Sequence, residues 1–152
     1  MFSLEKFCLA TKCTDNPKFA SWNFTKSNGP DGFYIHTKCN ATMAWYGITC
    51  QGTTIDVGSA DMFGTSETAQ EIRYHVTGLS LPNAGLSGSI SPYLGKLTYL
   101  ITMDLSDNAL VGTLPSELDY LIDLEHLNLR NNSLSGTIPP MTRSIHLRSL
   151  DV

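Results

Sequence analysis

Apolar residues recur at a fixed spacing in the second half of the chain. The pattern L-x-x-L-x-L occurs there in four copies, with conservative replacements, and the copies are 24, 24 and 23 residues apart. They start at Val76, Leu100, Leu124 and Leu147. A second block, Leu-x-Gly-x-Ile or Leu-x-Gly-x-Leu, follows each of the first three copies. Repetition at a period of this length predicts a solenoid, in which each repeat packs mainly against its neighbours.

The last two apolar residues of each copy are two positions apart, which is the periodicity of a β-strand. One short strand cannot bury its apolar side alone, so stacked copies predict a parallel sheet whose leucines point into one continuous core. Asn108 and Asn132 stand where the chain turns out of the strand, and we expect their amides to bond the backbone of neighbouring coils. Gly112 and Gly136 then permit a tight backbone turn.

The combined pattern L-x-x-L-x-L-x-x-N-x-L-x-G-x-I-P-x-x-L-x-x-L resembles the plant-specific subclass of leucine-rich repeats. That subclass occurs in receptor-kinase ectodomains and in secreted enzyme inhibitors, with related forms in algae and other protists. The resemblance implies an α/β fold: a right-handed leucine-rich repeat solenoid with a short parallel sheet on its concave face and a disulfide-containing N-terminal cap.

Two repeats depart from this pattern. In the first repeat, Ala84 replaces the Asn and Ser91-Pro92 replaces the Ile-Pro of the pattern. We interpret both departures as an end effect, because terminal repeats are often atypical. After Pro140 the apolar positions are weak, with Met141 and Ile145, and one residue is missing. This loss predicts a distorted turn in the third repeat.

Residues 1–75 are interpreted as an N-terminal capping region with an inserted loop, and residues 76–152 as three full repeats and an incomplete fourth. The spacing of Leu4, Phe7 and Cys8 predicts a short helix over residues 3–12, and Pro17 can open a second one. The motifs D-x-P…S-W-N and C…W-x-G-I-T-C resemble the cap of plant-type repeat proteins. They comprise Asp15, Pro17, Ser21, Trp22, Asn23, Cys39, Trp45, Gly47 and Cys50.

The first coil needs a cover with one apolar face, for which we expect Phe19, Trp22, Trp45 and Ile48. The alternative is that these aromatic residues are exposed and bind a ligand. The segment between this cap and the repeats is unusually long. We expect a short strand at Ile55–Val57, a polar surface loop over residues 58–68 and a strand over residues 71–81. The loop is either functional or a tolerated insertion.

All four cysteines lie in the first 50 residues, and an even count confined to a cap indicates disulfides. Their spacing fits a zinc site poorly. The cap resemblance implies a bridge between Cys39 and Cys50. Cys8 and Cys13 would lie about 7.5 Å apart along an unbroken helix, so they can pair only if the helix ends before Cys13.

Several features favour an extracellular location, either as a secreted protein or on the outer face of a membrane protein. Three glycosylation sequons begin at Asn23, Asn40 and Asn131, of which Asn131 should point outward while Asn132 points inward. The net charge of −4 gives no electrostatic basis for binding nucleic acid or anionic membranes. The sequence contains no membrane-spanning stretch and no convincing signal peptide at Met1.

The sequence shows no catalytic motif, so we predict a protein that is not an enzyme and carries no cofactor. The histidines His36, His75, His126 and His146 have neither H-E-x-x-H nor H-x-H spacing. Asp104 and Asp107 could hold calcium, but acidic pairs on a solvated surface are usually only surface residues. We therefore predict no metal site.

Binding remains as the function, and the residues between the inward leucines should form the binding face. Stacking places Ser80, Asp104, Asn128 and Asp151 in one row and Pro82, Ser106 and Arg130 in another. We expect no aromatic anchor on this face, whose partner-binding candidates are Thr102, Asp104, Ser106, His126, Asn128, Arg130 and Arg148.

We therefore predict an extracellular recognition module that binds a protein, a peptide or a glycan. The alternative is a structural glycoprotein, a building block of a matrix, filament or larger assembly. Because Leu147, Leu150 and Val152 would face water at the open end of the solenoid, we also expect further repeats, another subunit or self-association to cover them.

Overall fold

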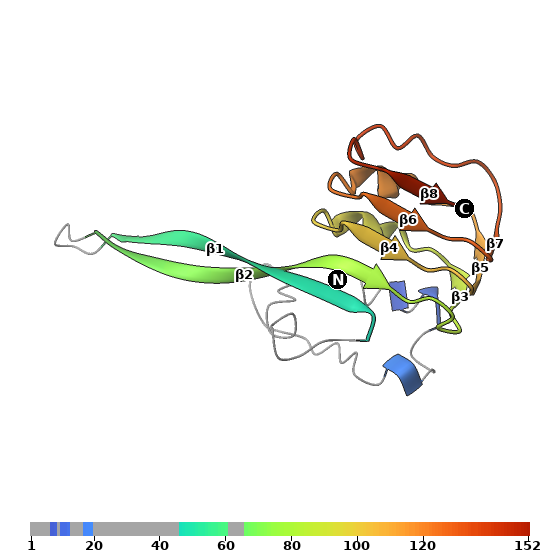
Figure 1. The fold of residues 1–152 in the computed structure, drawn as a ribbon, viewed down its shortest axis with the longest axis horizontal. Coiled ribbons are helices and arrows are strands. Elements are labelled where there is room, and N and C mark those ends of the chain that lie inside the picture. The colour runs from blue at the N-terminus through green and yellow to red at the C-terminus, as the bar shows by residue number, and fades with distance from the viewer. Residues whose placement is uncertain (1–6, 9, 13–16, 20–45, 61–65) are drawn as a thin grey trace.

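The computed structural model describes residues 7, 8, 10–12, 17–19, 46–60 and 66–152. These residues form stacked coils with a long two-stranded ribbon projecting from one end (Figure 1). The elements are η2 (Pro17–Phe19), β1 (Ile48–Ala60), β2 (Ser66–Ser80), β3 (Ser87–Ser89), η4 (Pro92–Lys96), β4 (Thr102–Asp104), β5 (Ala109–Gly112), η5 (Ser116–Tyr120), β6 (His126–Asn128), β7 (Ser133–Leu134) and β8 (Ser149–Asp151), where η marks a 3-10 helix.

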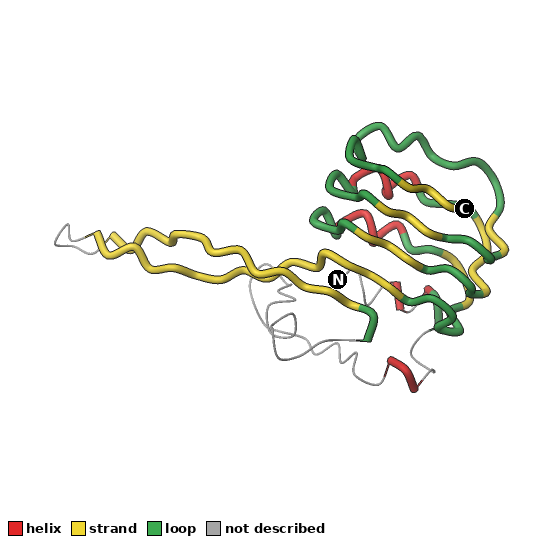
Figure 2. Tube along the Cα trace, in the orientation of Figure 1, coloured by secondary structure: helices red, strands yellow, loops and turns green. Residues whose placement is uncertain are grey.

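Two sheets follow the stacked coils in the described part of the chain (Figure 2). One has the strand order β1-β2-β4-β6-β8, and its pairs β2–β4, β4–β6 and β6–β8 are parallel, as the repeat pattern predicted. The other has the order β3-β5-β7 and was not predicted, because strands of two to four residues are too short to show an alternating pattern.

The core consists of the leucines that the repeat pattern placed inward. The last two apolar positions of each of the first three copies are at most 1% exposed: Leu79, Leu81, Met103, Leu105, Leu127 and Leu129. Leu94 in η4 and Leu118 in η5 are fully buried and close the coils on the opposite side. The prediction of one continuous apolar core is thus confirmed.

Asn108 bonds two successive coils, as predicted. Its Oδ1 accepts hydrogen bonds from the backbone N–H groups of Ala84 and Leu86, both at 3.0 Å. Its Nδ2 lies 2.9 Å from each of three carbonyl oxygens, those of Leu81, Leu105 and Ser106. Asn132 repeats the arrangement one coil later: its Oδ1 accepts from the Leu110 N–H, and its Nδ2 donates to the carbonyl oxygens of Leu105 and Leu129. These amides satisfy backbone groups that the turns leave without partners.

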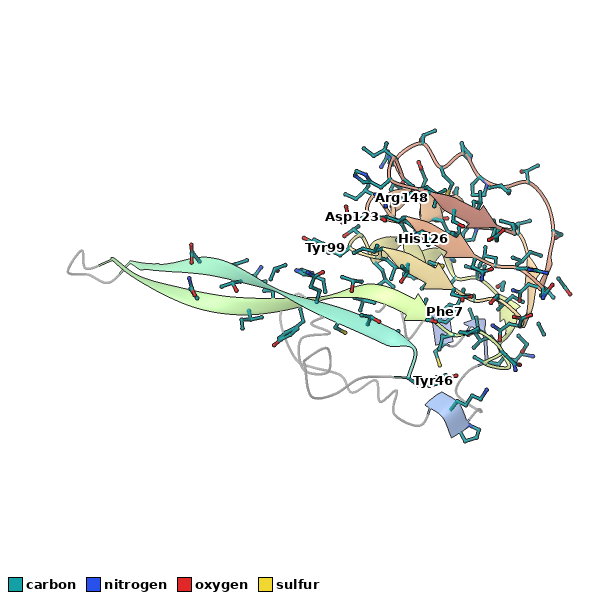
Figure 3. The ribbon with its side chains drawn as sticks, viewed as in Figure 1. Phe7, Tyr46, Tyr99, Asp123, His126 and Arg148 are labelled. Carbon is teal, nitrogen blue, oxygen red and sulfur yellow. The ribbon has the colours of Figure 1, made fainter. Side chains whose placement is uncertain are left out.

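The cap helix packs beneath the first coil. Phe7 (labelled in Figure 3) and Cys8 are buried in the same core cluster as the repeat leucines, and the Ser87 N–H donates to the Thr11 carbonyl at 3.1 Å. Gly88 has a φ of +88°, and a side chain there would collide with the Ala10 carbonyl. Of the four expected cover residues, Ile48 is buried, whereas Trp22, Trp45 and the side chain of Phe19 lie outside the described residues.

The helix stops earlier than the predicted residue 12, because Thr11 and Lys12 form a turn and Lys12 has a φ of +53°. The condition for pairing Cys8 with Cys13 is therefore met. Cys8 and Cys50 are both disulfide-bonded. Cys13 and Cys39 lie outside the described residues, and with them the predicted Cys39–Cys50 bridge.

The segment expected to be a short strand and a surface loop is instead a long antiparallel hairpin. β1 and β2 pair from Ile48 with Leu79 as far as Ala60 with Ser66. The predicted loop over residues 58–68 was therefore wrong at both of its ends, and the strand expected at Ile55–Val57 is part of β1. The pattern misled because the side chains of residues 51–54 and 70–73 are all solvent-exposed, so no apolar alternation marks these parts of the strands.

A β-bulge joins the ribbon to the coils. Thr49 pairs with Gly78 but Cys50 pairs with Val76, so Thr77 is an extra residue in β2. Val76 and Leu79 are consequently both buried although they are three residues apart. On the opposite face, the bulge brings the side chain of His75 into line with the outward positions of the sheet.

The third coil is distorted, as the missing residue predicted. Residues 139–147, all of which are described, contain no 3-10 helix. Ser144 occupies the position of Leu97 and Leu121 in the earlier coils, is buried, and donates to the Leu121 carbonyl at 2.9 Å. Ile145 is consequently 78% exposed. At the end of the sheet, Leu150 and Val152 are 38% and 54% exposed, as expected.

Candidate interaction surface

The outward residues of the parallel strands form rows across the coils, in the predicted register. The first row consists of Gly78, Thr102, His126 and Ser149. The second consists of Ser80, Asp104, Asn128 and Asp151. Thr102 and His126 are exposed, and Asp104 and Asn128 are half-buried. These rows give the sheet a polar face with both donors and acceptors.

Three of the candidate residues are engaged in holding turns. Oδ1 of Asp104 accepts from the backbone N–H of Ser106 at 3.0 Å and from its hydroxyl at 2.7 Å. Ser106 is 6% exposed, so the expectation that it faces a partner is wrong, because its hydroxyl turns back to Asp104. Oδ1 of Asn128 likewise accepts from the Arg130 N–H at 3.2 Å. These side chains shape the surface more than they offer contacts.

Two arginine residues, Arg148 and Arg130, lie on the later coils of this face. Arg148 forms an ion pair of 3.4 Å with Glu125, while 71% of the Arg148 side chain stays exposed. Arg130 is exposed at the far end of β6. Arg148 and Arg130 are therefore both exposed to solvent.

Sequence reasoning missed a pair of aromatic rings, His75 in β2 and Tyr99 just before β4. The rings of His75 and Tyr99 lie 3.9 Å apart, centre to centre, and tilted by 32°. Thr53 of β1 lies 3.2 Å from Nε2 of His75. Tyr99 is 50% exposed and lies on the same side of the coils as Asp123, His126 and Arg148 (Figure 3). Beside this face the structure therefore places an exposed aromatic side chain that precedes the strand residues considered in the sequence.

The repeat spacing contained a signal for this pair. Tyr99 directly precedes the first leucine of its copy, and His75 directly precedes Val76, so the two are 24 residues apart and stack. The same position holds Asp123 and His146 in the later copies. These four residues precede the leucine pattern, so they are not among the residues between the leucines from which the binding face was predicted.

Two other tyrosines, Tyr93 in η4 and Tyr120 in η5, serve for comparison. The Lys96 ammonium stands 5.0 Å from the Tyr93 ring centre, and the Arg143 guanidinium stands 4.8 Å from that of Tyr120. Tyr93 is 37% exposed. The Tyr93 ring thus contacts a cation of its own coil, and the Tyr120 ring contacts a cation of the next coil.

The described residues bring no three His, Cys, Asp or Glu side chains together in a metal-binding group. Asp104 is bonded to Ser106, and Oδ1 of Asp107 accepts from Asn131 at 2.7 Å. Helices long and apolar enough to cross a membrane are also lacking in the described ranges.

Of the three sequons, the one at Asn131 lies in the described residues, whereas Asn23 and Asn40 lie outside them. Asn131 is exposed with a φ of +55°, and Asn132 is half-buried in its ladder position. This arrangement confirms the register predicted for the third repeat and leaves the Asn131 amide accessible from solvent.

Comparison with known proteins identifies the same repeats. The family model described as Leucine Rich Repeat matches residues 99–121 and 123–145. Over 68 residues, 45% of this chain, the sequence is 40% identical to the LRR receptor-like serine/threonine-protein kinase GSO2 of Arabidopsis thaliana. The match spans 4% of that kinase.

Two crystal structures from Arabidopsis thaliana share the fold. The BIR2 ectodomain superposes with a TM-score of 0.67 at 28% identity, over 99% of this chain and 64% of that chain. The LRR ectodomain of the receptor kinase SOBIR1 superposes with a TM-score of 0.56 at 32% identity, over 77% of this chain and 60% of that chain. This chain thus spans less than two thirds of either ectodomain.

Proposed function

Because the chain is a leucine-rich repeat protein of the plant type, similar to receptor-kinase ectodomains, we propose that it is a non-enzymatic recognition module. It works outside the cell and binds a protein, peptide or glycan partner on the outward face of the sheet β2-β4-β6-β8. The observation that carries this proposal is the half-exposed Tyr99, stacked on His75 beside the row of Thr102 and His126.

Each part of this face has its own task in binding. Tyr99, His126 and Arg148 are the anchors, because aromatic and arginine side chains provide most of the energy in protein interfaces. Stacking on His75 restricts the Tyr99 ring before the partner arrives, so less side-chain entropy is lost on binding. Thr102 and Arg130 supply polar contacts around these anchors, while Asp104 and Asn128 keep the neighbouring turns rigid.

The extracellular assignment rests on the cap and the sequons. We propose N-linked glycans on Asn23, Asn40 and Asn131, and a Cys39–Cys50 bridge with Cys8 and Cys13 as the second pair. The disulfide-bonded state of Cys8 and Cys50 supports an oxidising compartment. A glycan on Asn131 would limit access to the far end of β6, next to Arg130, and direct partners toward the Tyr99 side.

The alternative is a structural role, as a building block of a matrix or filament. It predicts self-association and no discrete partner on the polar face. The two functions therefore differ in which surface becomes occupied.

Site-specific crosslinking tests the proposal. A photoreactive amino acid replaces Thr102, and a matched control replaces Val111, which is 46% exposed in the other sheet. After irradiation in the extracellular fluid of the producing cells, we expect discrete adducts from position 102 and none from position 111. Adducts from position 111 alone, or no adducts from either position, would refute the proposed face.

A further inference from the structure

We propose that two copies of this chain dimerise through the free edge of β2, so that the two ribbons form one four-stranded antiparallel sheet. β2 pairs with β4 only from Gly78 to Ser80. From Ser66 to Val76 it pairs, among the described residues, with β1 alone. The backbone groups along that stretch can therefore accept another strand.

The ribbon projects from the coils (Figure 1), and a two-stranded hairpin without a core is marginally stable in water. Further strands stabilise such a hairpin. Natural proteins often protect exposed edges with proline or with charged side chains, above all lysine. β1 and β2 contain neither lysine nor proline, and the charges of Glu71 and Arg73 are opposite in sign. The edge of β2 is thus open to strand addition.

The sequence around Ile72 is self-complementary, which is what a twofold interface requires. An antiparallel pairing centred on Ile72 sets Ile72 opposite its own copy and Glu71 opposite Arg73 of its partner, twice. Ile72 is a large apolar side chain that is 54% exposed in the single chain, and the pairing would cover it. Within one chain, Glu71 and Arg73 approach only to 3.6 Å, with 52% and 45% of their side chains exposed. They are therefore available to a partner.

The twist of the ribbon makes room for the second copy. β1 and β2 cross in Figure 1 between the coils and the far end of the ribbon. The edge of β2 that faces β4 near Gly78 has therefore turned away from β4 further out. A strand added around Ile72 does not have to enter the space that β4 occupies.

Charge reversal tests this interface through the mass of the particle in solution. By sedimentation velocity over a concentration series, the full chain should form a dimer. E71R or R73E alone should weaken it about tenfold or more, because two opposite-charge pairs become two like-charge pairs. An equimolar mixture of E71R and R73E should recover the dimer, because both cross-strand pairs are then opposite in charge again.

Two controls separate this interface from others. D56R makes the same change of charge as E71R, but on β1, which does not contact the second copy in the proposed sheet. It should leave the dimer intact. I72K places two ammonium groups opposite each other on the axis and should abolish it, while circular dichroism confirms that each variant is folded. A chain that is monomeric at all concentrations would overturn the proposal. So would a dimer that E71R, R73E and I72K leave unchanged, because it would use another surface.

Discussion

At the scale of single residues, the coils depend on a few side chains that contact backbone. Asn108 joins two coils: its oxygen accepts two hydrogen bonds, and its two amide N–H groups are shared among three carbonyl oxygens. Ser144 performs a smaller version of this task with one bond to the Leu121 carbonyl. In the two earlier coils, Leu97 and Leu121 fill the position of Ser144 with an apolar side chain.

Replacing Asn108 with alanine should destabilise the protein by roughly 2–4 kcal/mol, because partly buried backbone donors and acceptors lose their partner. Urea unfolding followed by circular dichroism measures this change. N131G is the matched control, since Asn131 is exposed, makes one side-chain bond, to Asp107, and has a φ of +55° that glycine adopts without strain. If the two variants were equally stable, the ladder would not hold the coils together.

Gly95 should not tolerate a side chain, because a Cβ atom there would collide with the Glu117 carbonyl of the next coil. We expect G95A to cost about 1–3 kcal/mol, since backbone of η5 must move. At Gly52 the nearest atoms belong to the side chains of Ile72 and Tyr74, which can rotate, so G52A should change the melting temperature less. Thermal melts of both variants test the distinction.

At the scale of elements, how much could be predicted from sequence depended on burial. The strands at Met103 and Leu127 were predicted correctly because each has a buried side that repeats in register. The ribbon was misjudged because residues such as Thr54 and Glu71 face solvent, so no pattern of burial shaped their sequence. Tyr99 was missed because its contact with His75 joins two repeats and is invisible within either one.

The cap should depend on its cysteines. Cys50 is disulfide-bonded at the base of β1 and packs against the core, so C50S should lower the free energy of unfolding by roughly 2–4 kcal/mol. Mass spectrometry of unreduced peptides should find Cys39 as its partner. Free thiols at Cys39 and Cys50 would contradict both the bridge and the extracellular assignment.

At the scale of the whole molecule, two surfaces point in different directions. The coils present a polar face with Tyr99 at its entrance, and the ribbon presents a strand edge centred on Ile72 (Figures 1 and 3). We propose that the first recognises a partner and the second joins two copies. A dimer of this kind would present two recognition faces, which raises the avidity for a partner that is itself multivalent.

Glycosylation should mark the boundary of the recognition face. We expect peptide mapping of the secreted protein to find an N-glycan on Asn131, because its amide is exposed after β6. One N–H remains after attachment, so the bond to Asp107 can persist. The S133A variant removes the sequon but leaves Asn131 in place, so it should lose one glycan mass and keep its melting temperature. An unmodified Asn131 in secreted protein would contradict this assignment.

The recognition face is the central claim, and calorimetry with the partner captured by crosslinking tests it most directly. Y99A should weaken binding by about 2 kcal/mol, or about thirtyfold in Kd, because it removes the stacked anchor. Y93A removes a partly exposed tyrosine of η4 in the same coil, whose ring contacts Lys96, and should leave Kd unchanged. Equal affinities for Y99A and the unsubstituted chain, or a loss confined to Y93A, would contradict the account.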